Sequence, residues 1–514
     1  MNDAPPPAEV ARSAGAGAGL SSAGAGPSGA GAGPSGAGAG PSGAGAGPTV
    51  AAGAGDIQEA LYEARRKIYP RAVKGWFAAW RWTLVAFTQA IFYGGPWMLW
   101  NDRQAVLFDL AHRKFFIFGL VLWPQDVIYL TGLLVIGALS LFLFTAVAGR
   151  LFCGYACPQT VYTEIFTWIE RRVEGDRLAR MRLDAAPLSA AKLGRKALKH
   201  SLWIALALWT GFTFVGYFTP IRQLGHEVLA FTLSGWESFW VLFYGFATYG
   251  NAGFMREQVC KHMCPYARFQ SSMFDRNTLI ITYDRERGEP RGARSRKADP
   301  KALGLGSCVN CNLCVEVCPT GIDIRNGLQY ECIGCAACID SCDTIMDRMG
   351  YPRGLIRYST ENALNGHWSR REVLRHVLRP RTLVYTGLLL AITAGLAVSV
   401  ALRVPLKVDV IRDRGMLARE LDDGLIENVY RLQVMNTEER THWYRIGVSG
   451  PAGLSLSSET EVQVPAASVR TVVAEVRLPR AAGQPGSNRI RFEVSAADAD
   501  GIRVSEKSVF VVPR

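Results

Sequence analysis

The sequence predicts a multi-domain membrane protein with a five-span α-helical membrane domain, an inserted cysteine-rich α+β domain and a C-terminal all-β domain. Three observations predict this combination. Five apolar stretches are long enough to cross a bilayer, eight cysteines lie between residues 308 and 342, and about the last 110 residues alternate between apolar and polar side chains. The chain has 514 residues, 49% of them hydrophobic, and a formal net charge of +13. Such a length suggests several domains.

Residues 1–55 are dominated by Gly, Ala, Ser and Pro and contain a seven-residue repeat, PSGAGAG. The repeat contains no large apolar residue, and its prolines would interrupt a helix, which excludes a coiled coil. We therefore expect a disordered tail of unknown role. The first twenty residues lack an apolar core, so we expect no cleavable secretory signal.

The five apolar stretches predict membrane-spanning helices, because about twenty apolar residues cross the hydrocarbon core. They are Trp82–Trp100, Ile128–Ala148, Ala197–Thr219, Trp236–Phe254 and Thr382–Leu402. Residues 56–270 would form a four-span membrane domain, and residues 361–403 a linker and the fifth span. The shorter apolar run Phe115–Trp123 ends at Pro124 and is expected to lie at the membrane interface.

Basic residues predict the orientation of these spans. Ten Lys and Arg residues lie between Arg150 and Lys199, whereas the loop between the third and fourth spans holds only Arg222. The positive-inside rule therefore places the N-terminus, this basic loop and residues 255–381 in the cytoplasm. Five crossings then place residues 404–514 on the periplasmic side of a bacterial inner membrane. Because these loops explain the basic charge, the expected environment is a lipid bilayer and no nucleic-acid partner is expected.

The eight clustered cysteines form the run C-x2-C-x2-C-x3-C twice, which is typical of a ferredoxin-type domain with two [4Fe–4S] clusters. We place this domain at residues 271–360. The fourth cysteine of each run ligates the other cluster in such proteins. The first predicted ligand set is therefore Cys308, Cys311, Cys314 and Cys342, and the second is Cys332, Cys335, Cys338 and Cys318. Zinc sites usually pair two C-x2-C elements, and disulfides require an oxidising compartment, so both fit less well. One departure from bacterial ferredoxins is Asp343, which follows the second run where Pro319 follows the first.

The other four cysteines form two C-x3-C-P motifs, one after the second apolar stretch and one after the fourth. They are Cys153 with Cys157, and Cys260 with Cys264. If the helices continue into the motifs, cysteines four apart share one face. The matched positions suggest a duplicated hairpin whose four thiols converge on a metal or redox site. Thiolates favour Cu(I), zinc or iron–sulfur, with His262 and Met263 as candidate further ligands. Cycling as disulfides, alone or together with metal binding, stays open.

Residues 404–514 contain short runs with a period of two, separated by turn-forming clusters such as Gly450–Gly453. Four of the runs are Tyr430–Val434, Val472–Leu478, Ile490–Val494 and Ser508–Val512. Their spacing predicts an immunoglobulin-like sandwich of about seven strands. The domain contains no cysteine, and nothing in it indicates catalysis.

On these motifs the chain resembles the FixG/CcoG/RdxA family of cytochrome c oxidase accessory proteins, which are membrane iron–sulfur proteins. The resemblance covers roughly residues 57–514. It rests on GRLFCGYACPQT at 149–160, C-x3-CPYARFQ at 260–270, CPTGIDIR at 318–325, CAACIDSCD at 335–343 and GYPRGLIRY at 350–358. The fifth span and the C-terminal domain distinguish it from the similar quinol-dehydrogenase subunits of nitrate reduction.

The resemblance implies a protein that assembles a cbb-type haem–copper oxidase, acting as a Cu(II) reductase. Copper would be handled by the catalytic thiols of Cys153, Cys157, Cys260 and Cys264. The implied partners are an unidentified cytoplasmic electron donor and proteins of oxidase assembly or copper trafficking. Two alternatives stay open, namely a quinol-linked electron-transfer subunit and a non-enzymatic redox sensor or assembly scaffold.

Overall fold

The structure is a computed structural model that describes residues 67–300, 302–413 and 418–513. The predicted tail, residues 1–55, lies outside the described residues.

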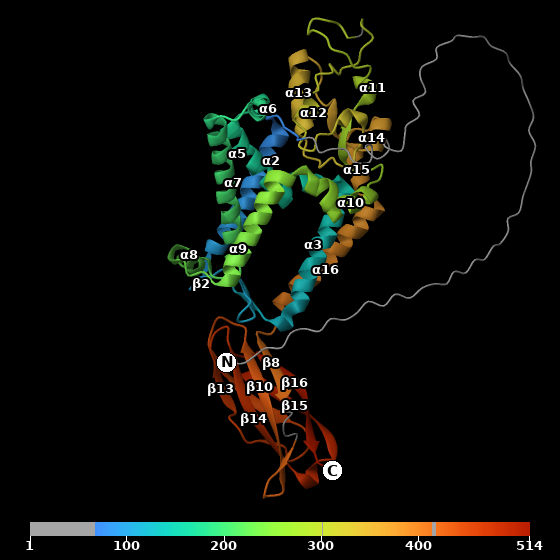
Figure 1. Cartoon of the computed structure of the whole chain (residues 1–514). Helices are drawn as coiled ribbons and strands as arrows, with labels where there is room; N and C mark the ends of the chain where they lie inside the picture. The colour runs from blue at the N-terminus through green and yellow to red at the C-terminus, as the bar shows by residue number, and fades with distance from the viewer. Residues whose placement is uncertain (1–66, 301, 414–417, 514) are drawn as a thin grey trace, which may run out of the picture. The chain divides into compact units, whose positions relative to one another are not determined.

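Five long helices lie at the five apolar stretches (Figure 1). They are α2 (Trp76–Gly94), α3 (Val127–Ala148), α7 (Ala190–Val215), α9 (Gly235–Thr248) and α16 (Pro380–Ala401). Among the described residues, three helices are long and apolar enough to cross a membrane: α3 with its preceding turn, α7 and α16. The apolar surfaces of α3 and α16 are not buried by protein, and the two helices lie side by side. Exposed apolar helices of this length are typical of a membrane protein.

Helices α2 and α9 differ from the predicted spans. Helix α2 begins at Trp76 rather than Trp82 and therefore includes the charged residue Arg81. Helix α9 has 14 residues and continues into a π-helical segment, Tyr249–Met255. Segments of π-helix often occur at functional sites. That α2 and α9 cross the membrane stays a prediction.

The connection between α2 and α3 is built of short strands. Strand β1 (Leu99–Trp100) pairs with β2 (Arg103–Gln104), and a three-stranded sheet contains β3 (Val106–Asp109), β4 (Lys114–Ile117) and β5 (Leu120–Leu122). The apolar run that was expected at the membrane interface thus forms β4 and β5. Its residues Phe116, Val121 and Trp123 are buried against Met435 of the C-terminal domain.

Further helices complete the membrane domain. They are α4 (Leu151–Tyr155), α5 (Pro158–Glu174), α6 (Arg177–Ala185), α8 (Ile221–Ala230), a second π-helical segment (Val259–Met263) and α10 (Pro265–Met273).

The cysteine-rich domain is closed by two strands from its ends. Strand β6 (Ile280–Tyr283) pairs antiparallel with β7 (Ile356–Ser359), and both cysteine runs lie between them in the chain. The helices of this region are α11 (Arg285–Gly288), α12 (Leu313–Glu316), α13 (Ala337–Met349), α14 (Glu361–Asn365) and α15 (Arg370–Val377). Ile281, Ile339 and Met346 pack with several of the cysteines in one buried core.

The C-terminal domain is a sandwich of two antiparallel sheets. One sheet has the order β12-β14-β10-β8 with β9 on β10, and the other has the order β13-β11-β15-β16. The strands are β8 (Leu406–Arg412), β9 (Arg419–Glu420), β10 (Leu425–Asn436), β11 (His442–Ser449), β12 (Ser455–Leu456), β13 (Glu461–Val464), β14 (Val469–Pro479), β15 (Gly486–Ala496) and β16 (Arg503–Val512). Seven of the strands in this described part of the chain are four residues or longer, as predicted.

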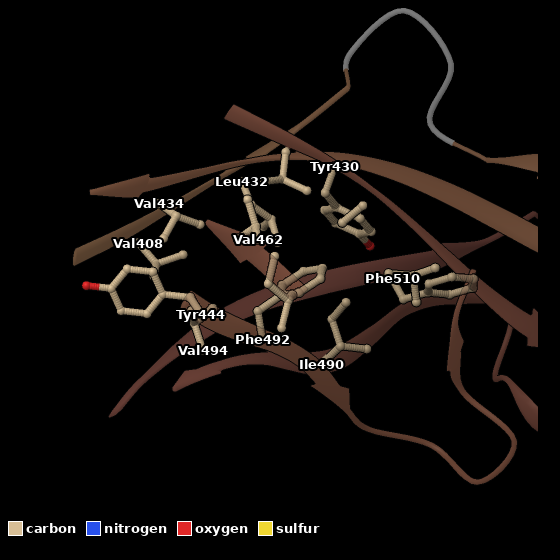
Figure 2. Close-up of a cluster of buried hydrophobic side chains, with 14 of the residues drawn as sticks. Val408, Tyr430, Leu432, Val434, Tyr444, Val462, Ile490, Phe492, Val494 and Phe510 are labelled. Carbon is tan, nitrogen blue, oxygen red and sulfur yellow. The ribbon is translucent and has the colours of Figure 1, made fainter. Parts of the chain in front are cut away.

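Alternating side chains from both sheets meet in one core (Figure 2). Tyr430 and Leu432 of β10 face Phe492 of β15 and Phe510 of β16. All four side chains are fully buried. The period-two pattern thus reflects burial of one face of each sheet, and the predicted all-β sandwich is confirmed.

Candidate iron–sulfur and thiol sites

The two cysteine runs adopt the same backbone conformation. Asn310 and Asn312 flank Cys311 with φ values of 52° and 57°, and Gly334 and Ala336 flank Cys335 with 68° and 58°. A left-handed conformation is uncommon for residues other than glycine, especially for alanine. The last of these residues in each run directly precedes a helix, α12 or α13. The repeated sequence therefore folds into a repeated loop.

The eight cysteines of these runs divide between two cavities of similar size. A first cavity of about 370 Å³ is lined by Cys308, Cys311, Cys314 and Cys342. A second cavity of about 330 Å³ is lined by Cys318, Cys332, Cys335 and Cys338, with Cys314 at its border. Each cavity thus receives the fourth cysteine of the other run. The grouping supports the crossed ligand assignment, which stays a prediction.

The chemistry of both cavities fits a [4Fe–4S] cluster, because each offers four thiols within an apolar lining. Burial raises the pKa of the Cys314 thiol to about 11, and the pKa values of Cys332 and Cys342 to about 12. The free thiols are therefore protonated near neutral pH, and iron binding would release these protons. When bound, such clusters supply one-electron transfer.

Arg325 fixes the loop of the first cavity. Its guanidinium donates to Asn310 Oδ1 and Asn312 Oδ1, both at 2.8 Å, and forms a two-pronged ion pair with Asp323 at 2.8 and 2.6 Å. The side chains of the two left-handed asparagines thus hold the loop in place. Gly334 and Ala336 have no such side chains in the second run.

The loop of the second cavity is instead held by the membrane domain. A Cβ on Gly154, inside the first C-x3-C-P motif, would lie 2.8 Å from the Ile333 carbonyl oxygen and 2.9 Å from the Cys335 nitrogen. A Cβ on Gly334 would lie 3.1 Å from the Arg150 carbonyl oxygen. Tyr358 also donates from its hydroxyl to the Gly334 carbonyl at 2.6 Å. The two backbones are therefore in direct contact, which only glycine permits here.

Helices do not run continuously through the C-x3-C-P motifs, so the condition for a shared helical face is not met. Cys153 lies in the short helix α4, and Cys260 lies in a π-helical segment. Cys157 and Cys264 are extended residues directly before Pro158 and Pro265, which begin helices α5 and α10. Proline suits the first position of a helix because its missing N–H needs no partner there. The two motifs thus end in the same way.

The four C-x3-C-P thiols, called the thiol site below, lie near one another. Cys153 and Cys260 pack in one cluster with Cys335 and Cys338 of the second cavity. Burial, followed by the charge of Cys157, raises the pKa of Cys153 to about 11 and that of Cys260 to about 12. Cys264 also acts electrostatically on its three partners. This proximity supports the predicted convergence of the thiols.

The surroundings of the thiol site are partly polar. The Cys153 thiol donates to Gln270 Oε1 of α10 at 3.4 Å, so the helix after the second motif contacts the first. His262 and Met263 are exposed. Within residues 67–300, 302–413 and 418–513, no three or more His, Cys, Asp or Glu side chains are grouped as they would be around a single metal ion.

Asp340 attaches the cysteine-rich domain to helix α2. Its carboxylate, which lies between Cys338 and Cys342 in α13, accepts the backbone N–H groups of Phe77 at 3.2 Å and Ala78 at 2.8 Å. A carboxylate at a helix N-terminus satisfies free N–H groups and interacts favourably with the helix dipole. One turn further along α2, Arg81 is buried near this junction. The motifs indicate neither residue, although a charge inside an apolar stretch is a signal of function.

Comparison with known proteins identifies three matching family models. A model described as a 4Fe-4S dicluster domain matches residues 255–361, and one described as a 4Fe-4S binding domain matches residues 130–174. The model of the IG-like fold at the C-terminal of FixG matches residues 396–513. The segment 130–174 contains Cys153 and Cys157, so part of the thiol site belongs to an iron–sulfur family model.

Three similar proteins cover most of the chain. The nitrogen fixation protein FixG of Rhizobium meliloti is 40% identical over 421 residues, which are 76% of this chain and 80% of the relative. Protein RdxB of Cereibacter sphaeroides is 40% identical over 475 residues, covering 88% and 97%. Protein RdxA of the same organism is 38% identical over 472 residues, covering 88% and 99%.

The crossed ligation can be tested by combining cysteine substitutions. Cys318→Ala alone should lower the iron content from about eight to about four atoms per chain, because one of two clusters is lost. Adding Cys335→Ala should cause little further loss, since both residues line the second cavity. Adding Cys311→Ala instead should remove nearly all iron. Iron analysis of anaerobically purified protein checks this, and the reverse pattern would show uncrossed ligation.

The backbone contact at Gly154 can be tested with Gly154→Ala. Because the added methyl group meets backbone atoms that cannot rotate away, we expect a loss of stability of about 1–3 kcal/mol. Thermal unfolding and protease resistance of the cysteine-rich domain in the full chain would measure the effect. Gly137→Ala in α3 is the matched control, because a Cβ there meets nothing within 4 Å. Equal behaviour of the two variants would contradict the contact.

Proposed function

The chain belongs to the FixG/RdxA family, and from this membership we propose that it reduces Cu(II) to Cu(I) at the thiol site, for assembly of a cbb-type haem–copper oxidase. Its relatives and its two 4Fe-4S family domains support an iron–sulfur electron-transfer protein. Copper as the substrate is the further step of this proposal.

One observation carries the proposal: Cys153 and Cys260 pack in the same hydrophobic cluster as Cys335 and Cys338 of the second cavity. A metal ion held by the C-x3-C-P thiols would therefore lie close to predicted ligands of the cluster in the second cavity. The contact between Gly154 and the Cys335 backbone holds the two sites at this separation. Short separations of this kind are what electron transfer between two centres requires.

The ligand type of the thiol site favours the reduced ion. Thiolate sulfur is a soft donor and selects Cu(I) over harder ions. In the proposed reaction each Cu(II) gains one electron and becomes Cu(I), and the electron comes from a cytoplasmic reductant. Because the thiols bind the product more strongly than the substrate, they would draw the reduction forward. Cu(I) would then pass to copper-trafficking or oxidase-assembly proteins.

We further propose five membrane crossings, with the cysteine-rich domain in the cytoplasm and the sandwich in the periplasm. Contacts at opposite ends of α3 support this topology. At its start, Asp126 forms an ion pair with Arg403 at 2.9 Å and another with Lys407 of β8. At its end, the Val147 carbonyl accepts the N–H of Leu279 at 3.0 Å. Helix α3 has 22 residues and is roughly 33 Å long, which matches the thickness of the hydrocarbon core.

The copper step can be tested with protein whose clusters have been reduced and from which excess reductant has been removed. Wild type should reduce about two Cu(II) ions per chain, since each of two clusters yields one electron. The variant with all four C-x3-C-P cysteines changed to serine should be at least about tenfold slower, because it lacks the soft donors. A chromophoric Cu(I) chelator measures the product.

Iron content provides the control for this comparison. The serine variant must retain about eight iron atoms per chain, so that slow reduction reports the thiol site and not the loss of clusters. Equal rates in the two proteins would defeat the copper assignment. Oxidation of the clusters by quinone with no dependence on copper would favour the quinol-linked alternative.

Copper retention should also depend on pH. Cys153 and Cys260 are protonated at neutral pH because their pKa values are raised to about 11 and about 12. Each thiol that binds Cu(I) as thiolate must release its proton, so the apparent affinity should rise roughly tenfold per pH unit for each proton released. Competition with a Cu(I) chelator between about pH 6 and pH 8 measures this slope. A flat profile would contradict binding by buried protonated thiols.

A further inference from the structure

Arg81 is a buried cation without a carboxylate partner. Its side chain is 7% exposed, and its Nε is buried and has no hydrogen-bond partner. No ion pair of Arg81 with a carboxylate occurs among the residues that the structure describes. Burying an uncompensated charge costs several kcal/mol, so a compensating charge is expected nearby.

The two carboxylates that interact electrostatically with Arg81 each have other partners. Glu164 forms an ion pair with Arg171 at 3.5 Å. Asp340 accepts the N–H groups at the start of α2. The Arg81 guanidinium also interacts electrostatically with the sulfur of Cys335.

The position of Arg81 explains this influence. Arg81 lines a cavity of about 860 Å³, including its opening, between α2, α5 and the cysteine-rich domain. Four residues of its wall also line the second cavity; they are Pro319, Thr320, Ile333 and Ala337. A single layer of residues therefore separates the open cavity beside Arg81 from the four thiols of the second cavity.

The first cavity also has a buried arginine, but its charge is neutralised. Arg325 lines that cavity and is 8% exposed, and its guanidinium is paired with Asp323 at 2.6 Å. The pair contributes little net charge to the first cavity. The surroundings of the two predicted clusters thus differ in one respect that the repeated sequence hides: the arginine that lines the first cavity is paired with a carboxylate, whereas Arg81 is not.

We propose that Arg81 is the counter-charge of the cluster in the second cavity and selectively raises its reduction potential. This inference rests on the proposed function, in which the second cavity lies next to the thiol site. Reduction adds one negative charge to a cluster, so a nearby cation stabilises the reduced form. Arg81 would offset the opposite effect of burial, which disfavours added charge. Arg81 is a positioning residue: it acts on the cluster through its charge and does not touch the substrate.

The test is a redox titration of the holoprotein, followed by EPR. Arg81→Met should lower the potential of one cluster so that its reduced-to-oxidised ratio at a fixed potential falls at least tenfold, which is about 59 mV for a one-electron couple. The other potential should not move. Cys311→Ser, which alters only the first cavity, identifies which potential belongs to which cluster.

Three further variants separate charge from packing. Arg81→Lys retains the charge and should retain most of the wild-type potential. Thr163→Asp places a carboxylate in the cavity that Arg81 lines and should lower the same potential, which keeps the test available if Arg81→Met does not assemble. Arg71→Met is the matched control from the same cavity, because Arg71 is paired with Glu316, which also keeps Arg177 as a partner. This control should leave both potentials unchanged.

The outcomes distinguish the inference from the proposed function. If wild type lacks two titrating clusters, the proposed function itself fails. If wild type shows both clusters but Arg81→Met and Thr163→Asp leave the potentials unchanged, the role of Arg81 is overturned. Equal shifts of both clusters, or an equal effect of Lys and Met, would also overturn it, because they indicate altered packing and not a local charge.

Discussion

The close approach of two backbones at Gly154 and Gly334 is the constraint on which the functional region depends. One glycine belongs to the first C-x3-C-P motif and the other to the second cysteine run, and a side chain on either would meet backbone atoms within 3.1 Å. Because backbone cannot yield as a flexible side chain does, the two loops can dock only while both positions lack a Cβ. This docking sets the distance between the thiol site and the second cavity.

The same junction is held by hydrogen bonds of polar groups, some between the two domains and one within the cysteine-rich domain. The Asp340 carboxylate accepts hydrogen bonds from free N–H groups at the start of α2, and the Tyr358 hydroxyl donates to the carbonyl of Gly334. Each of these bonds joins the cysteine-rich segment either to the membrane domain or to the loop that contacts it. A buried polar group left without its partner costs about 1–3 kcal/mol, so these bonds favour one docked arrangement over others. The cysteine-rich domain is therefore fixed against the membrane domain by directional bonds as well as by apolar contact.

Much of the architecture can be predicted from the local pattern of apolar and polar residues. A helix or strand with one buried and one exposed face repeats its apolar residues at a regular spacing. The runs around Tyr430 and Ile490 predict strands for this reason, and β10 and β15 contain them. Cysteine spacing predicts the grouping of thiols in the two cavities. The sequence does not predict the role of Arg81 or the end of the helix before Cys157, because both depend on which distant segments pack against these residues. The condition for a shared helical face, a helix that continues into each C-x3-C-P motif, is not met, because the last cysteine of each motif is an extended residue before the proline that begins the next helix.

Cys311 differs from the other seven cysteines of the two runs, all of which the structure describes, because it is exposed while they are buried or partly buried. Oxidation of cysteine ligands follows their accessibility. Damage by air or peroxide should therefore begin at this one corner and reach the inner group of thiols later. A chain with this weak point would keep its first ligand set intact only while its surroundings stay reducing.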